Sequence, residues 1–172
     1  DKVKVIEAEE SLSFVRKSVE LLAKELKDQV PLIGFAGGPY TLASYMIEGG
    51  HSRNHEKTKS LMYNFENDWH RFLDKITAVT ISYLSMQIKA GAQAIQLFDS
   101  WVGKLSPEDY RRYVFPHSAK ILGAIKSQFP HTPRIHFGVD TAMLLPAMKE
   151  AGASVMGVDW QTPLSFAQKT LG

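Results

Sequence analysis

The sequence predicts an α/β fold built around a parallel sheet. Short apolar runs alternate with longer amphipathic stretches along the chain, which is the pattern of strands alternating with helices. The short runs are mainly apolar rather than alternating, as in parallel strands that are covered on both faces. Each run ends in glycine or polar residues, at the position where α/β proteins carry their active sites. We expect a single domain over residues 1–172.

The expected strands are the four apolar runs, each ended by a turn or a polar group. The first run stops at Gly37-Gly38-Pro39, and the second is followed by Asp99-Ser100. Glycine and proline at these points break a regular strand, so they mark its end. The predicted strands are 31–36, 94–98, 134–137 and 154–159.

The expected helices are the intervening stretches, where apolar residues recur every three or four positions. Ser106-Pro107 begins one of them with an N-cap and a proline, and Thr162-Pro163 repeats that start. Gly91 and Gly152 stand where a left-handed cap closes a helix. The predicted helices are 11–28, 41–48, 57–65, 68–90, 107–128, 141–151 and one from 162 to the C-terminus.

Composition excludes several classes of protein. The chain has no cysteine, which rules out a disulfide scaffold and a zinc site built on thiolates. Its 20 basic and 18 acidic residues give a net charge of only +2, without basic blocks, so we expect no nucleic-acid or membrane partner. No apolar run approaches the roughly 20 residues of a membrane span, and the N-terminus has no signal-peptide core. We expect a cytoplasmic protein.

Length bears on the type of sheet. A complete eight-stranded α/β barrel takes about 250 residues, whereas this chain has 172. The residue pattern alone does not distinguish an open doubly wound sheet from a section of a barrel. Taken as complete, the chain would favour the open sheet.

The strongest candidate site residues follow the first two strands. Asp99 and Ser100 could orient or hydrogen-bond a substrate, or they could cap the following turn. Ser100 lacks the Gly-x-Ser-x-Gly context of a nucleophile. Phe35 and Phe98, near the ends of their strands, could stack on a flat ligand, although most such aromatics are core. Tyr45 lies one helical turn beyond Thr41, with core packing as the alternative.

Other residues give weaker signals. His51 and His55 are four apart, but without further ligands they indicate a solvated loop rather than a metal site. His136 lies within a strand and is expected to be structural, and Asp159 is either a site carboxylate or a loop cap. The glycines around Phe35 lack a phosphate-loop pattern, so nucleotide binding is rejected. We expect neither a cofactor nor a metal.

One long segment resembles a known family. Residues 31–50, PLIGFAGGPYTLASYMIEGG, are similar to the central signature of the uroporphyrinogen decarboxylase family. Residues 87–103, 105–110, 135–138 and 157–160 agree with the same family in the same order. The resemblance therefore covers the chain from about residue 10 to the C-terminus.

The resemblance implies a fold and an activity. The family folds as a (β/α)8 TIM barrel, usually a homodimer, and acts without a metal or organic cofactor. It removes the carboxyl groups of the four acetate side chains of uroporphyrinogen III, giving coproporphyrinogen III in haem biosynthesis. On this resemblance, Tyr45 and Ser100 hydrogen-bond substrate carboxylates, while Phe35 and Phe98 pack against the macrocycle.

The resemblance also implies that parts of the family's site lie outside these residues. The family's arginine-rich loop and its pyrrole-binding aspartate match positions before residue 1, and a late histidine matches beyond Gly172. Asp99, Asp140 and Asp159 do not replace that aspartate. We therefore expect an internal fragment of about four consecutive parallel βα units, a partial (β/α)8 barrel without a certain catalytic residue and inactive by itself.

Alternatives remain open. The chain could be a non-catalytic porphyrinogen-binding fragment, or a corrinoid-linked methyltransferase of the same superfamily, although the latter needs thiolate ligands that a cysteine-free chain lacks. A four-stranded piece of a barrel would leave sheet edges and core exposed. We expect either self-association or a strand order unlike that of the intact barrel.

Overall fold

The fold is α/β, with its parallel strands in the order in which they occur along the chain. The computed structural model describes residues 3–27, 29–50 and 52–172, and within these ranges four strands form one sheet, β1-β2-β3-β4. All neighbouring pairs are parallel, with Gly37 opposite Phe98 and Phe98 opposite Phe137, so their carboxyl ends meet at one edge. The strands are β1 (Ile33–Gly37), β2 (Ala94–Phe98), β3 (Arg134–Phe137) and β4 (Val155–Met156).

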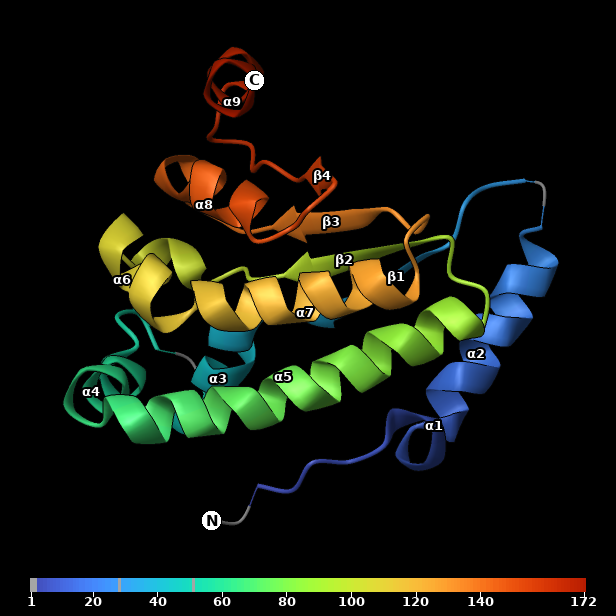
Figure 1. The fold of residues 1–172 in the computed structure, drawn as a ribbon, viewed down its shortest axis with the longest axis horizontal. Helices are drawn as coiled ribbons and strands as arrows, with labels where there is room; N and C mark the ends of the chain where they lie inside the picture. The colour runs from blue at the N-terminus through green and yellow to red at the C-terminus, as the bar shows by residue number, and fades with distance from the viewer. Residues whose placement is uncertain (1–2, 28, 51) are drawn as a thin grey trace.

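The helices connect successive strands on one side of the sheet (Figure 1). A doubly wound sheet reverses its strand order and carries helices on both faces. Sequential order with helices on one face is instead the arrangement of a section of a (β/α)8 barrel. The preference for an open sheet, and the alternative of a different strand order, are therefore wrong. The helical elements are α1 (Ala8–Ser11), α2 (Ser13–Glu25), α3 (Pro39–Glu48), α4 (Glu56–Asn64), α5 (Glu66–Lys89), η1 (Val102–Lys104), α6 (Pro107–Tyr113), α7 (Phe115–Gln128), η2 (Ala142–Leu144), α8 (Leu145–Glu150) and α9 (Leu164–Leu171).

The strands are covered on one face only, which corrects the expectation of two covered faces. Burial alternates along β1 and β2: Ala36 and Leu97 are buried against the helices, whereas Phe35 is 58% exposed. The runs are nevertheless mainly apolar because the second face also carries large apolar groups, such as Ile33 and Val155. In a closed barrel that face lines the interior.

Two apolar clusters hold the helices in place. One lies beneath the sheet, where Ile95 and Leu97 of β2 belong to the same cluster as Leu84 of α5 and Leu122 of α7. The other lies beyond the carboxyl ends of the strands, around Trp69 of α5, whose indole N–H donates to the carbonyl of Tyr113 at 2.9 Å. This second cluster anchors α3 and α6 next to the strand-end loops.

Some helix boundaries differ from prediction. The helix predicted over 107–128 is two helices, α6 and α7, separated at Val114. Pro116 explains the break, because proline has no N–H to donate and its ring clashes with the carbonyl four residues earlier. The helix predicted over 11–28 breaks at Leu12 and ends at Glu25, and residue 28 lies outside the described ranges.

The predicted caps are confirmed at some positions and wrong at one. Ser106 accepts a hydrogen bond from the amide of Asp109 at 3.1 Å, and Gly91 and Gly152 have φ of 112° and 109°. Thr162, by contrast, does not cap α9: its hydroxyl donates to Asp159 at 2.6 Å, and the helix begins two residues later. This bond belongs to the loop after β4. The strand predicted over 154–159 is shorter in the structure, where β4 extends only over Val155–Met156.

No helix in the described part of the chain is both long enough and apolar enough to cross a membrane.

Candidate functional site

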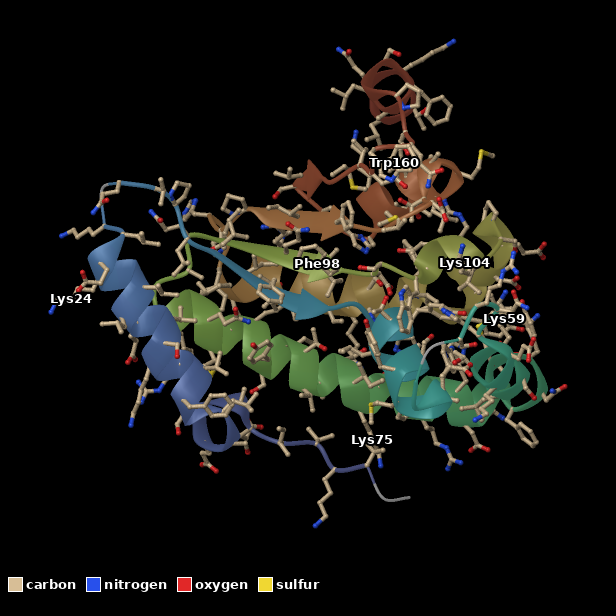
Figure 2. All side chains as sticks on the ribbon, turned by 180° about the vertical axis from the view of Figure 1, so that it is seen from behind. Lys24, Lys59, Lys75, Phe98, Lys104 and Trp160 are labelled. Carbon is tan, nitrogen blue, oxygen red and sulfur yellow. The ribbon has the colours of Figure 1, made fainter. Side chains whose placement is uncertain are left out.

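The candidate site lies at the carboxyl edge of the sheet and on its open face. Phe98 lies on this face, which is turned toward the viewer in Figure 2, with Lys59 and Lys104 near the same edge. The loops that follow β1, β2, β3 and β4 gather here because parallel strands all point the same way.

A row of phenylalanines crosses the open face. The rings of Phe35 and Phe98 meet edge to face with centroids 5.7 Å apart, and Phe98 meets Phe137 in the same way at 5.6 Å. Such a row offers a broad apolar surface on which a flat ring system can pack. The structure thus brings together the predicted Phe35 and Phe98. It adds Phe137, the last residue of β3, which the strand-end argument used for Phe98 would also have found.

Tyr45 lies on α3 next to the loop that follows β2. Its ring is 4.2 Å from that of Trp101, at an interplanar angle of 38°, and the residue is 56% exposed. It is not packed in the core, so that alternative is wrong. Trp101 was not among the predicted site residues, although an aromatic residue directly after Ser100 in a strand-end loop was a signal.

Asp99 is fully buried and holds the start of α3. Its carboxylate accepts hydrogen bonds from the amide of Thr41 at 2.9 Å and from the Thr41 hydroxyl at 2.8 Å. Gly38, the N-cap of α3, has no side chain to cap these amides, so Asp99 supplies the acceptor from the neighbouring strand. Asp99 therefore caps α3 rather than its own turn. Burial raises the pKa of its carboxyl to about 6, although the hydrogen bonds from Thr41 act the other way.

Ser100 follows Asp99 and is partly buried. Its carbonyl accepts a hydrogen bond from the amide of Val139, which links the loops after β2 and β3. Among the described residues, the hydroxyls of Ser100 and Tyr45 have no protein hydrogen-bond partner. Both hydroxyls are therefore available to donate to a ligand.

Asp140 and Asp159 connect loops to one another. The Asp159 carboxylate accepts from the amide of Asp140 at 2.7 Å and from the hydroxyl of Thr162. Burial would raise the pKa of Asp159, but these hydrogen bonds outweigh it and lower the pKa. Asp140, with a left-handed φ of 58°, pairs with Lys104 at 3.3 Å and accepts from Gln161 at 2.6 Å. Asp159 is thus a loop cap, as one of the two interpretations predicted.

Comparison with known proteins agrees with this geometry. A match to the family described as uroporphyrinogen decarboxylase (URO-D) extends over residues 1–172. The chain belongs to the uroporphyrinogen decarboxylase family. It is 52% identical over 172 residues to the uroporphyrinogen decarboxylase of Salinispora tropica, covering all of this chain and 45% of that protein. It is 53% identical over 163 residues to that of Streptomyces avermitilis, covering 95% of this chain and 45% of that protein.

The chain therefore spans about 45% of the length of these curated relatives. Among solved structures, a methyltransferase from Methanosarcina mazei matches with a TM-score of 0.80 at 17% identity. That match covers 94% of this chain and 46% of the other. At such low identity it shows a shared fold alone.

Two histidines singled out in the sequence, His55 and His136, are buried in this decarboxylase-family chain. His136 is buried, with Nδ1 3.2 Å from the carbonyl of Met148, and burial lowers its pKa to about 4. His55 is also buried, with its ring 4.8 Å from that of Trp101, so the expectation of a solvated loop is wrong. His51 lies outside the described residues. In the described ranges, no three histidine or acidic side chains form a group that could hold a metal ion.

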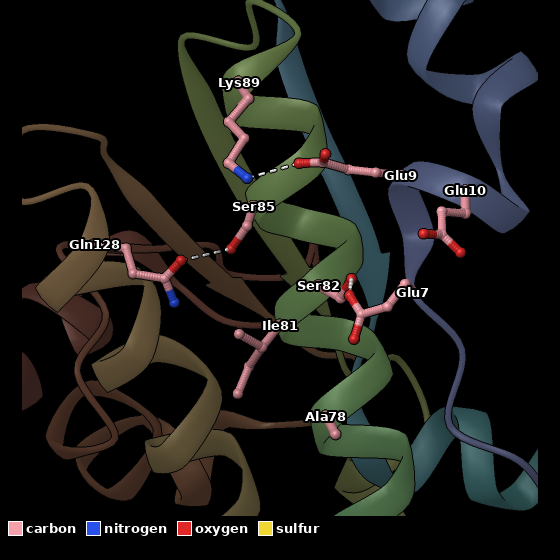
Figure 3. Close-up of a pocket in the computed structure, with 9 residues that line it drawn as sticks. All are labelled: Glu7, Glu9, Glu10, Ala78, Ile81, Ser82, Ser85, Lys89 and Gln128. Atoms are coloured by element: carbon pink, nitrogen blue, oxygen red, sulfur yellow. Dashed lines mark hydrogen bonds and ion pairs between the residues drawn. The ribbon is translucent and has the colours of Figure 1, made fainter.

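A separate hollow of about 580 Å³ lies on the helix-covered side of this decarboxylase-family fold, between α1, α5 and the end of α7 (Figure 3). Glu7, Glu9 and Glu10 line one wall, and Lys89 pairs with Glu9 at 2.6 Å. Three carboxylates against one paired lysine repel an anionic ligand. This hollow is therefore a poor site for a polycarboxylate, unlike the open face of the sheet.

Proposed function

We propose that this chain carries the macrocycle-binding part of a uroporphyrinogen decarboxylase, which converts uroporphyrinogen III to coproporphyrinogen III. The observation that supports this most is the phenylalanine row beside two unpaired hydroxyls. Phe35, Phe98 and Phe137 offer the apolar surface, and Tyr45 and Ser100 lie on elements that meet at its carboxyl edge. A tetrapyrrole with carboxylate side chains needs both kinds of contact.

The chemistry requires an electron sink in the substrate. Protonation of a pyrrole carbon makes the ring cationic, and the bond between the acetate methylene and its carboxylate then breaks. The electron pair of that bond moves toward the ring as carbon dioxide leaves. A proton then adds to the methylene to complete a methyl group, and loss of the ring proton restores the pyrrole. The substrate itself accepts the electrons, so the proposed reaction needs no cofactor.

The residues of this chain contribute binding and orientation. The phenylalanine row packs against the macrocycle, and the hydroxyls of Tyr45 and Ser100 donate to substrate carboxylates, which fixes the ring relative to the protein. Asp99 is unsuited to stabilising the cation, because its side chain is fully buried and its Oδ1 atom is held by Thr41. We propose that the cation-stabilising aspartate and the basic groups belong to other parts of a longer, homodimeric enzyme.

Two other functions have less support in the structure. The methyltransferase likeness concerns the fold alone, and a chain without cysteine lacks the thiolates that a zinc-dependent methyltransferase would use. A non-catalytic porphyrinogen-binding fragment would bind its ligand through the same phenylalanine row. It differs from the proposed enzyme only in whether the full-length gene product turns substrate over.

Binding of uroporphyrin III, the stable oxidised form of the substrate, tests the proposed site. We expect saturable quenching of porphyrin fluorescence by the 172-residue chain, weakened roughly tenfold by Phe35→Ala, which removes a ring from the row. Phe14→Ala is the matched control, since Phe14 is 66% exposed but lies on α2, away from the sheet face. Equal effects of the two variants, or no binding by the wild type, would contradict the proposal.

A further inference from the structure

We propose that Thr41 is a positioning residue that sets the Tyr45 phenol relative to the Ser100 hydroxyl. This inference rests on the proposed function, in which these two hydroxyls hold substrate carboxylates. Neither the resemblance nor the comparisons assign a role to Thr41. The proposal depends on how this buried side chain joins α3 to the loop after β2.

Thr41 bridges two residues that flank Ser100. Its hydroxyl donates to the carboxylate of Asp99 at 2.8 Å and accepts from the amide of Trp101 at 3.1 Å. Its own amide also donates to Asp99, at 2.9 Å. Ser100 lies between Asp99 and Trp101, so the backbone on both of its sides is bonded to the same threonine.

The same link reaches Tyr45 by a second route. Tyr45 is four residues beyond Thr41 on α3, which places the two side chains on one face of the helix. The Tyr45 ring packs against the indole of Trp101 at a tilt of 38°, and the amide of Trp101 donates to the Thr41 hydroxyl. Thr41 therefore acts on the position of the Tyr45 phenol by two routes, through the backbone of α3 and through the ring of Trp101.

The link has little freedom to rearrange at its centre, where Thr41 and Asp99 are buried. Thr41 is 5% exposed and Asp99 is fully buried. Gly38 passes so close to Asp99 that an added Cβ would lie 2.5 Å from the carboxylate carbon. Loss of the Thr41 hydroxyl would remove one of the two donors to Asp99 Oδ1 and the acceptor of the Trp101 amide, and such losses are costly in a buried position.

Two variants separate the hydroxyl from the shape of the side chain. Thr41→Val keeps the shape and removes both hydroxyl bonds, whereas Thr41→Ser keeps the hydroxyl. Thr80→Val is the matched control, because Thr80 is similarly buried but lies on α5, outside the link. Trp101→Leu removes the stack without changing a hydrogen-bonding side chain of the link, and it serves if Thr41→Val does not fold.

Proton NMR of the tyrosine rings in the 172-residue chain reads the position of Tyr45 directly. Stacking on an indole shifts the ring protons of Tyr45 upfield, and Tyr45→Phe identifies its signal among six tyrosines. We expect Thr41→Val and Trp101→Leu to abolish this shift, while Thr41→Ser and Thr80→Val retain it. An unchanged Tyr45 shift in Thr41→Val, with the fold intact, would overturn the proposal.

Affinity for uroporphyrin III provides the functional readout through a mutant cycle. We expect Thr41→Val to raise Kd roughly tenfold in the wild type, but less than about twofold in a Tyr45→Phe, Ser100→Ala background that lacks both positioned hydroxyls. Additive effects would mean that Thr41 acts by general stabilisation, which contradicts positioning. If the wild type binds no uroporphyrin, the proposed function fails, and the NMR shift still decides whether Thr41 positions Tyr45.

Discussion

The carboxylate of Asp99, at the end of β2, accepts hydrogen bonds from both the amide and the hydroxyl of Thr41, at 2.9 and 2.8 Å. One buried side chain thereby caps the helix that carries Tyr45 and fixes the loop that carries Ser100. The arrangement explains why an aspartate that looked like a catalytic candidate in the sequence is a structural group in the fold.

Asp99 is expected to make folding stability depend on pH. Its pKa is about 6 in the folded chain, against an ordinary value of 3.8, so the folded state binds the proton more tightly. The stability associated with that proton is fully present below about pH 4 and is lost as pH rises through 6. Relative to Asp99→Asn, the wild type should lose on the order of 3 kcal/mol of unfolding free energy between pH 4 and 7.

Urea unfolding of both proteins across this pH range measures the effect. Taking the difference between wild type and variant removes the contribution of His117 and His136, whose lowered pKa values act in the opposite direction. A difference in unfolding free energy that stays constant from pH 4 to 7 would contradict the assignment.

Substitution of Gly38 is expected to be severely destabilising. An alanine Cβ would lie 2.5 Å from Cβ and Cγ of Asp99, so Gly38→Ala must displace the cap of α3. We expect a loss of roughly 2–4 kcal/mol in unfolding free energy. Gly123→Ala, within α7 and with nothing within 4 Å of the added carbon, should instead stabilise by about 0.5–1 kcal/mol. If thermal unfolding shows that both variants change the unfolding free energy in the same direction, the close approach of Gly38 to Asp99 is refuted.

The isolated chain is expected to self-associate. Its sheet presents an uncovered apolar face, and further large apolar side chains are exposed on the loop after β4 and on α9, including Trp160 at 90% and Leu164 at 74%. Burial of such surface is favourable at about 25 cal/mol per Å², which drives contact between copies. Size-exclusion chromatography with light scattering should show dimers or larger species, and a stable monomer at high concentration would be evidence against it.

The sequence was sufficient to predict the order of strands and helices, because apolar runs and helical spacing are local signals. β2 and β3 agree with prediction to the residue, and β1 differs by one or two. The covering of only one face was not predictable, because both faces of these strands carry mainly apolar residues. The split at Val114 was missed because Ser106-Pro107 suggested one long helix, although Pro116 was visible in the sequence.

The site was predicted in part. Phe35, Phe98, Tyr45 and Ser100 came from strand-end positions and from the family resemblance, and the structure sets the phenylalanines in one row. The contacts of Trp101 with Tyr45 and of Asp99 with Thr41 join residues 56 and 58 positions apart. Contacts between residues so distant in sequence have no periodic signal, so only the fold reveals them.

Conversion of uroporphyrinogen III to coproporphyrinogen III, followed anaerobically by chromatography of the oxidised products, tests the central claim most directly. We predict that the full-length gene product performs all four decarboxylations, and that Tyr45→Phe combined with Ser100→Ala lowers its kcat/KM by roughly 100-fold. The 172-residue chain alone should convert none. A full-length protein without turnover, or turnover by the 172-residue chain alone, would contradict the account.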